Sequence, residues 1–204
     1  MIDLKNLTPF QLDALKEIGN IGASHADTAL SELLRKKVWI SVPEAKVVPL
    51  DEVPQEFGGA EKMVVGVYLQ MQGQISGNIL FFFSQETAMT LADILMNRPA
   101  GTTKVLNEMD QSAIKETGTI LAGSCLTALS ALTNKEIIPS IPYYAMDMLG
   151  ALVDFIIINL SQNAEYAMII QLEFSESEYK IDGSFLLLPD PQSLEVILTS
   201  LGVG

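Results

Sequence analysis

The chain of 204 residues has little of several residue types on which common active sites depend. It contains one cysteine, one histidine and one tryptophan. The single cysteine, Cys125, cannot form an internal disulfide, and Cys125 with His25 is too small a ligand set for a zinc site. The sequence therefore predicts neither a disulfide framework nor a metal centre of its own.

Basic residues are also scarce, with 12 Lys and Arg against 25 Asp and Glu and a net charge of −13. A surface this negative repels phosphate backbones and anionic lipid, so we expect no nucleic acid and no membrane among the partners. The first residues lack a basic segment followed by an apolar stretch, so no signal peptide is expected and the protein is predicted to be cytoplasmic. The apolar run 149–160 is interrupted by Asp154 and is shorter than the roughly 20 residues that span a bilayer, which favours a buried helix or strand.

An internal repeat is the strongest feature of what is present. The tetrapeptide Thr-Ala-Leu-Ser at 28–31 returns at 127–130, and the ungapped segments 13–43 and 112–142 share about 14 of 31 residues. A second echo relates 77–83 to 183–189, with an insertion expected around 146–160. We predict one domain, 1–204, made of two repeats at about 9–98 and 108–203 with a linker at 99–107, because each half alone is small for a core.

Each repeat is predicted to contain a long helix, then strands, then a short helix. Thr8 as N-cap and Pro9 at the first helical position begin a helix at Pro9–Leu34. The other predicted elements of the first repeat are strands at 38–50, bent at Pro43, 62–72 and 77–83, and a helix at 85–96. Those of the second are helices at 109–132 and 192–201 and strands at 137–142, 164–174 and 179–188. The fold class is α+β, with an antiparallel sheet of about six strands, helices packed on it and a pseudo-two-fold axis.

The first long helix carries a polar stripe, formed at spacings of four, three and four by Asp13, Glu17, Asn20 and Ser24. The opposite side is apolar and can pack on the sheet, so the polar stripe is expected to be exposed. Gly19 and Gly22 flank Asn20, and each glycine costs a helix interior about 1 kcal/mol relative to Ala. Either a neighbouring helix packs close to them, or an outside molecule approaches the backbone near Asn20.

The pattern Asp13-x3-Glu17-x2-Asn20 resembles the signature of the CheC/CheX/FliY family of response-regulator phosphatases. The second long helix carries Ser112-x3-Glu116-x2-Thr119, in register within the repeat. The resemblance covers essentially the whole chain. It implies a pseudo-two-fold duplicated CheC-like fold with two long motif-bearing helices packed on the sheet.

The resemblance also implies an activity, the removal of the phosphoryl group from the aspartyl-phosphate of the response regulator CheY. Asn20 is then expected to hold a water molecule in line with the phosphorus, since a carboxamide both donates and accepts hydrogen bonds. Glu17 is expected to pair with a lysine of the regulator, and Asp13 to add a contact at the rim. No cofactor of its own is expected, because Mg²⁺ would be supplied by the bound regulator.

The second helix departs from the family pattern at Thr119, which stands where the family has Asn. A threonine hydroxyl is shorter and lacks the two distinct groups of an amide. We therefore predict a degenerate second site at Ser112, Glu116 and Thr119 that docks without catalysis. The alternative is that Thr119 works poorly but measurably.

Two other functions stay open. Family members also pair with CheD, a receptor-modifying deamidase, so the chain could be a largely non-catalytic adaptor for phosphorylated CheY and CheD. A flagellar-switch role is suggested by the fold that the family shares with the FliM middle domain. That role is disfavoured, because FliM-like domains lack the Glu and Asn pair.

Overall fold

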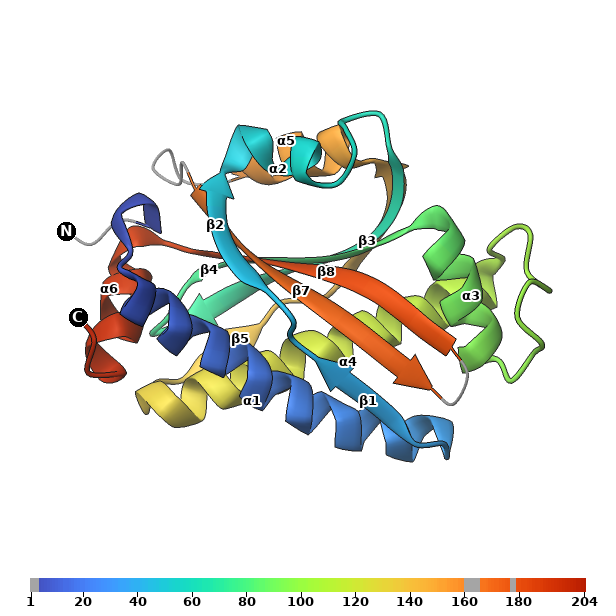
Figure 1. Ribbon diagram of the computed structural model, residues 1–204, viewed down its shortest axis with the longest axis horizontal. Helices are drawn as coiled ribbons and strands as arrows, with labels where there is room; N and C mark the ends of the chain where they lie inside the picture. The colour runs from blue at the N-terminus through green and yellow to red at the C-terminus, as the bar shows by residue number, and fades with distance from the viewer. Residues whose placement is uncertain (1–3, 160–165, 177–178) are drawn as a thin grey trace.

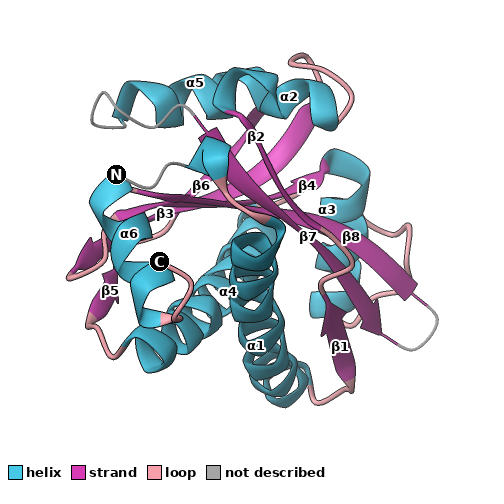
Figure 2. Ribbon diagram, turned by 60° about the vertical axis from the view of Figure 1, so that its left-hand side comes forward, coloured by secondary structure: helices cyan, strands magenta, loops and turns pink. Residues whose placement is uncertain are grey.

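An antiparallel sheet runs through the middle of the molecule, with helices on both of its faces (Figure 1, Figure 2). The computed structural model describes residues 4–159, 166–176 and 179–204. The long helices α1 (Pro9–Leu34) and α4 (Glu108–Thr133) lie side by side on one face. The shorter helices α2 (Val53–Glu56) and α5 (Leu149–Asn159) cover the other face.

The remaining elements follow the same order in both halves of the chain. In the first half they are β1 (Val38–Ser41), β2 (Ala45–Pro49), β3 (Met63–Gly73), β4 (Gly77–Ser84) and α3 (Gln85–Leu95). In the second half they are β5 (Ile137–Pro139), β6 (Tyr143–Met148), β7 (Tyr166–Glu176), β8 (Tyr179–Pro189) and α6 (Pro191–Ser200). Two 3₁₀ turns, Leu4–Asn6 and Leu50–Glu52, precede α1 and α2.

The two halves exchange their edge strands. The strand order is β1-β7-β8-β4-β3-β5, with β2 also paired to β7 and β6 also paired to β3. The short strands β1 and β2 therefore share one edge position, beside the long strand of the second half, and β5 and β6 share the other, beside the long strand of the first. Because each half completes the sheet of the other, the halves are interlocked.

A proline lies at each break between two edge strands, Pro43 between β1 and β2 and Pro142 between β5 and β6. Proline cannot donate a ladder hydrogen bond, so it is tolerated at the edge of a sheet and interrupts the strand there. The single strand predicted at 38–50 is therefore divided at Pro43, which has the edge position that the sequence allowed.

The central strands are buried on both faces. In β4, Phe81 and Phe83 belong to the core between the sheet and the long helices, whereas Leu80 and Phe82 belong to a second core beneath α5. Successive side chains of a strand point to opposite faces. This explains why β4 reads as a continuous apolar run rather than as an alternating one.

The two long helices have matching ends. In α1, the backbone N–H of Gln11 donates to Thr8 Oγ1 at 3.3 Å and that of Thr8 to Gln11 Oε1 at 2.9 Å, a capping box that Asn107 and Asp110 repeat at the start of α4. Both helices end at a residue in the left-handed conformation, Arg35 and Asn134. Between these caps, each helix is 26 residues long.

The connection between the halves is held by buried carboxylates. Asp93 accepts hydrogen bonds from the backbone N–H of Thr102 at 2.9 Å and from Thr103 Oγ1 at 2.6 Å, and Arg98 donates to Asp110 at 2.5 Å. Burial acts to raise the pKa of Asp93, but the hydrogen bonds from Thr103 and Thr102 and the charge of Arg98 hold it below its ordinary value. The connection is thus tied to the end of α3 and the start of α4.

The predicted α+β fold class is confirmed, with six strand positions across the sheet. Helix α1 has the predicted bounds. Strand β6 and helix α2 were not predicted, and α5 lies where the insertion was expected. Residue 160 of the expected insertion and residues 164–165 of the predicted strand lie outside the described residues. The boundaries of the repeats and of the linker stay a prediction.

Candidate functional site

The predicted polar stripe lies exposed along α1. The side chains of Asp13, Glu17, Asn20 and Ser24 all face solvent. Asn20 Nδ2 lies 3.4 Å from Glu17 Oε2, so the amide and the carboxylate meet on the surface. The structure therefore brings together Glu17 and Asn20 of the motif, on an exposed side of α1 and within reach of an external partner.

Gly22 lets α1 approach α4 closely. A Cβ atom at Gly22 would lie 2.8 Å from Cys125 Cα, closer than two helix backbones with an intervening side chain permit. Gly19 faces the sheet instead, where a Cβ atom would lie 3.4 Å from the side chain of Ile170. Both glycines lie on the buried side of α1. Of the two explanations that the sequence left open, close packing of a neighbouring helix accounts for Gly22, and neither glycine lies on the exposed side.

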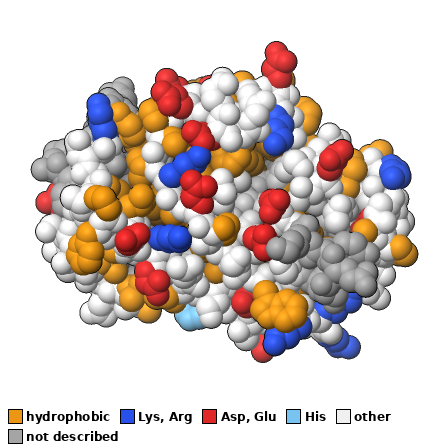
Figure 3. Space-filling model, in the orientation of Figure 1, with side chains coloured by type: hydrophobic (Ala, Val, Ile, Leu, Met, Phe, Trp, Pro, Cys, Tyr) orange, Lys and Arg blue, Asp and Glu red, His pale blue; other side chains and the backbone are white. Residues whose placement is uncertain are grey.

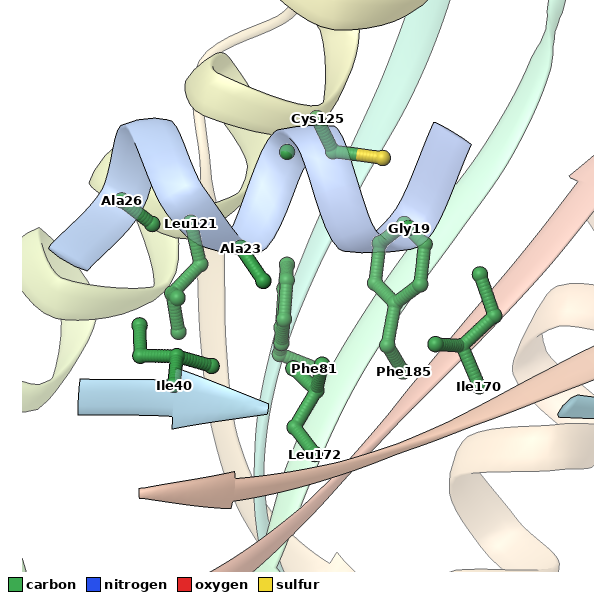
Figure 4. A pocket seen from close by; sticks show the side chains of 11 residues that line it. Gly19, Ala23, Ala26, Ile40, Phe81, Leu121, Cys125, Ile170, Leu172 and Phe185 are labelled. Carbon is green, nitrogen blue, oxygen red and sulfur yellow. The ribbon is translucent and has the colours of Figure 1, made fainter. Parts of the chain in front are cut away.

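A small cavity of about 20 Å³ lies under α1, between the two long helices and the sheet (Figure 4). Its lining is apolar apart from the thiol of Cys125, and it has room for about one water molecule. Burial raises the pKa of Cys125 to about 12, so this thiol is not a nucleophile at neutral pH. The cavity is a packing gap rather than a substrate pocket.

The corresponding stripe on α4 differs at its last position. Ser112 and Glu116 are exposed, as Asp13 and Glu17 are. Thr119 is only partly exposed, and its Oγ1 donates to the backbone carbonyl of Lys115 at 2.8 Å. The only proton of that hydroxyl is thereby directed at its own helix, whereas Asn20 presents an amide to solvent.

The chemistry available on either stripe is hydrogen bonding and charge pairing. Among the residues described, no group of three His, Cys, Asp or Glu is placed to hold a metal ion, and no helix has the length and apolar character needed to cross a membrane. A convex helix surface with one amide and one carboxylate suits the completion of a site on another molecule. The bond that occupies Thr119 could not have been found from sequence, because threonine hydroxyls in helices also point to solvent.

Comparison with known proteins gives this surface a context. A model of the CheC-like family matches residues 10–47, which include Asp13, Glu17 and Asn20. Among solved structures, FliY from Thermotoga maritima superposes with a TM-score of 0.82 at 22% identity, covering 97% of this chain and 98% of that one. CheX in the CheX–CheY–BeF₃–Mg²⁺ complex from Borrelia burgdorferi gives a TM-score of 0.51 at 19% identity, covering 84% and 96%.

The fold is therefore the one found in FliY and CheX, an interlocked sheet carrying two long helices. The chain is also 36% identical, over 95% of its length and 95% of the relative's, to a protein of Bacillus subtilis strain 168 named CheY-P phosphatase CheC. The chain belongs to the CheC-like family, as the motif on α1 predicted.

Proposed function

We propose that this protein removes the phosphoryl group from the aspartyl-phosphate of CheY and that α1 is its catalytic surface. The relative from Bacillus subtilis is named for this activity, and the CheX structure from Borrelia burgdorferi holds CheX in a complex with CheY. The observation that carries the proposal is the exposed pair of Glu17 and Asn20 on one stripe of α1.

In the proposed reaction, the oxygen of a water molecule attacks the phosphorus while the bond from phosphorus to the aspartyl oxygen breaks. The products are inorganic phosphate and the free aspartate carboxylate. Asn20 enters the regulator's site and holds the water in line, donating through Nδ2 and accepting through Oδ1. The acceleration comes from positioning, because the amide neither accepts a proton nor forms a bond.

Glu17 has the complementary role of fixing the orientation of the partner. Its carboxylate is one helical turn from Asn20 and is suited to pair with a lysine of the regulator. Asp13, one turn further along the stripe, adds a contact at the rim. We propose that Mg²⁺ belongs to the regulator, since neither stripe offers a set of metal ligands.

The α4 stripe is proposed to dock without catalysis. Ser112 and Glu116 repeat the docking residues, but Thr119 has one hydroxyl in place of an amide, and that hydroxyl is bound to Lys115. It can hold a water in line only after this bond is broken.

The test is the lifetime of phosphorylated CheY, measured alone, with wild type and with Asn20→Ala. Wild type should shorten the lifetime and Asn20→Ala should not. Thr28→Ala is the matched control, because Thr28 is exposed two turns further along α1. If Asn20→Ala is as active as wild type, α1 is not the catalytic helix; if wild type itself is inactive with its own regulator, the adaptor function replaces the phosphatase.

CheD is the second partner expected from the sequence, and its binding stays a prediction. Pull-down of purified CheD by the wild-type chain, with and without phosphorylated CheY, tests it. Retention of CheD that depends on phosphorylated CheY, together with little hydrolysis, would favour the adaptor function.

A further inference from the structure

A large apolar side chain lies exposed at the beginning of the catalytic stripe. Phe10 is 70% exposed at the second position of α1. It precedes Asp13 by three residues and Glu17 by seven, so it shares their side of the helix. In Figure 3, apolar side chains lie among charged ones at the left-hand end of the face, where α1 begins.

The start of α1 does not need Phe10 for its own stability. The residue before the N-cap, Leu7, and the fourth helical residue, Leu12, are the partly buried pair that packs on the core, as in a hydrophobic staple. The N-cap bonds are made by Thr8 and Gln11. A polar residue at the position of Phe10 would satisfy the helix equally well.

The same arrangement recurs on α4. Met109 occupies the second helical position there, three residues before Ser112, and is 63% exposed. A single exposed apolar residue is ordinary. Two of them, at equivalent positions next to corresponding stripes, point to a shared use.

We propose that Phe10 is the apolar anchor by which α1 docks the phosphorylated response regulator. The inference rests on the proposed function and extends it by a residue that determines affinity. Aromatic side chains dominate the energetics of protein interfaces because they bury much area at little cost in conformational entropy. Phe10 is continuous with Asp13 and Glu17, so a partner that places its phosphoryl group at Asn20 also covers Phe10.

The position of Phe10 determines what its loss does. Asn20 lies ten positions further along the helix, a distance of about 15 Å along the axis. The ring therefore lies away from the reacting atoms and contributes equally to the ground state and the transition state. Its removal weakens binding and leaves the chemical step unchanged.

The experiment compares full-length wild type with Phe10→Ala, Phe10→Met and Leu33→Ala. Hydrolysis is measured over a range of phosphorylated CheY concentrations, and binding is measured to CheY carrying BeF₃ and Mg²⁺. Leu33 is the matched control, since it is 53% exposed near the far end of the same helix. Phe10→Ala should raise KM and Kd about tenfold with kcat unchanged, Phe10→Met should restore most of the affinity, and Leu33→Ala should match wild type.

The inference is overturned if Phe10→Ala keeps the wild-type Kd, or if it lowers kcat at an unchanged KM. An equal rise in Kd for Leu33→Ala would also overturn it, because the effect would then not be local to the stripe. Failure of the proposed function gives a different result, in which wild type does not accelerate decay at all. In that event the Kd for the BeF₃ complex still decides whether Phe10 docks the regulator.

Discussion

Helices α1 and α4 have the same length, the same type of cap at both ends and a corresponding polar stripe, yet they differ at the position to which we assign the chemistry. Asn20 presents a solvent-facing amide, whereas the hydroxyl of Thr119 is bound to its own backbone. Their common framework is set by capping and by core packing. The comparison teaches that two helices with the same framework can present surfaces of different hydrogen-bonding chemistry.

The helices also differ in how closely the sheet approaches two equivalent glycines, Gly19 of α1 and Gly118 of α4. A Cβ atom at Gly118 would lie 2.7 Å from Val67 Cβ, whereas one at Gly19 would lie 3.4 Å from the flexible end of Ile170. The branch point of a valine next to a strand backbone cannot move aside as the end of an isoleucine can. The α4 helix is thus seated more tightly on the sheet at this point.

The largest expected effect comes from making α1 resemble α4. Asn20→Thr should reduce the acceleration of CheY-phosphate decay at least about 100-fold, because a misplaced water loses the in-line geometry. The decay of the phosphorylated regulator under single-turnover conditions measures it. Retention of more than half of the activity would show that the amide does not account for the proposed difference in activity between the two helices.

A smaller effect, on stability, is expected at the two glycines. Gly118→Ala should lower the free energy of unfolding by about 1 to 3 kcal/mol through overpacking against Val67. Gly19→Ala should leave it unchanged or raise it by up to about 1 kcal/mol, because Ala favours the helix. Urea unfolding of both variants measures the difference. Equal destabilisation by the two substitutions would contradict the conclusion that α4 packs more tightly on the sheet at Gly118 than α1 does at Gly19.

The reverse substitution sharpens the comparison further. Thr119→Asn, made in the Asn20→Thr background, should restore about tenfold of activity by giving α4 a solvent-facing amide. The matched control is Thr127→Asn in the same background, since Thr127 Oγ1 donates to the Gly123 carbonyl at 2.8 Å in the same way. Absence of any gain would mean that α4 lacks more than the amide.

The smallest effect concerns the connections at the starts of the two helices. Gln11 of α1 donates to the Val203 carbonyl at 2.7 Å, whereas Asp110 of α4 is bound by Arg98, next to Asp93. The pKa of Asp93 is lowered in the folded state, so the stability that it contributes is present above the ordinary carboxyl pKa and is lost as the pH falls through the folded value.

Urea unfolding between neutral and acidic pH measures this contribution. Wild type should lose stability on acidification, and Asp93→Asn should be less stable at neutral pH and should lose less on acidification. Gln11→Ala removes the uncharged hydrogen bond to the Val203 carbonyl and should leave the pH dependence as in wild type. An unchanged pH profile in Asp93→Asn would rule out Asp93 as the titrating group.

Local signals in the sequence predicted most of the elements. The bounds of α1 follow from Thr8, Pro9 and the apolar stripe, all of which act within a few residues. Strand β6 was missed because residues 143–148 are mostly exposed and lack clear alternation; their pairing with β3 creates the strand. The polar stripe was found because helical spacing fixes which residues share a side.

The sequence by itself determined that residues 13–43 resemble residues 112–142, that two long helices carry corresponding polar stripes, and that only the first stripe has an amide. Those features depend on residue identity and on local periodicity. Only the tertiary structure decided that the halves exchange edge strands, that Gly22 serves contact with α4, and that the hydroxyl of Thr119 is occupied. These depend on pairings between distant segments and on the choice of a side-chain rotamer, which packing of the whole molecule selects.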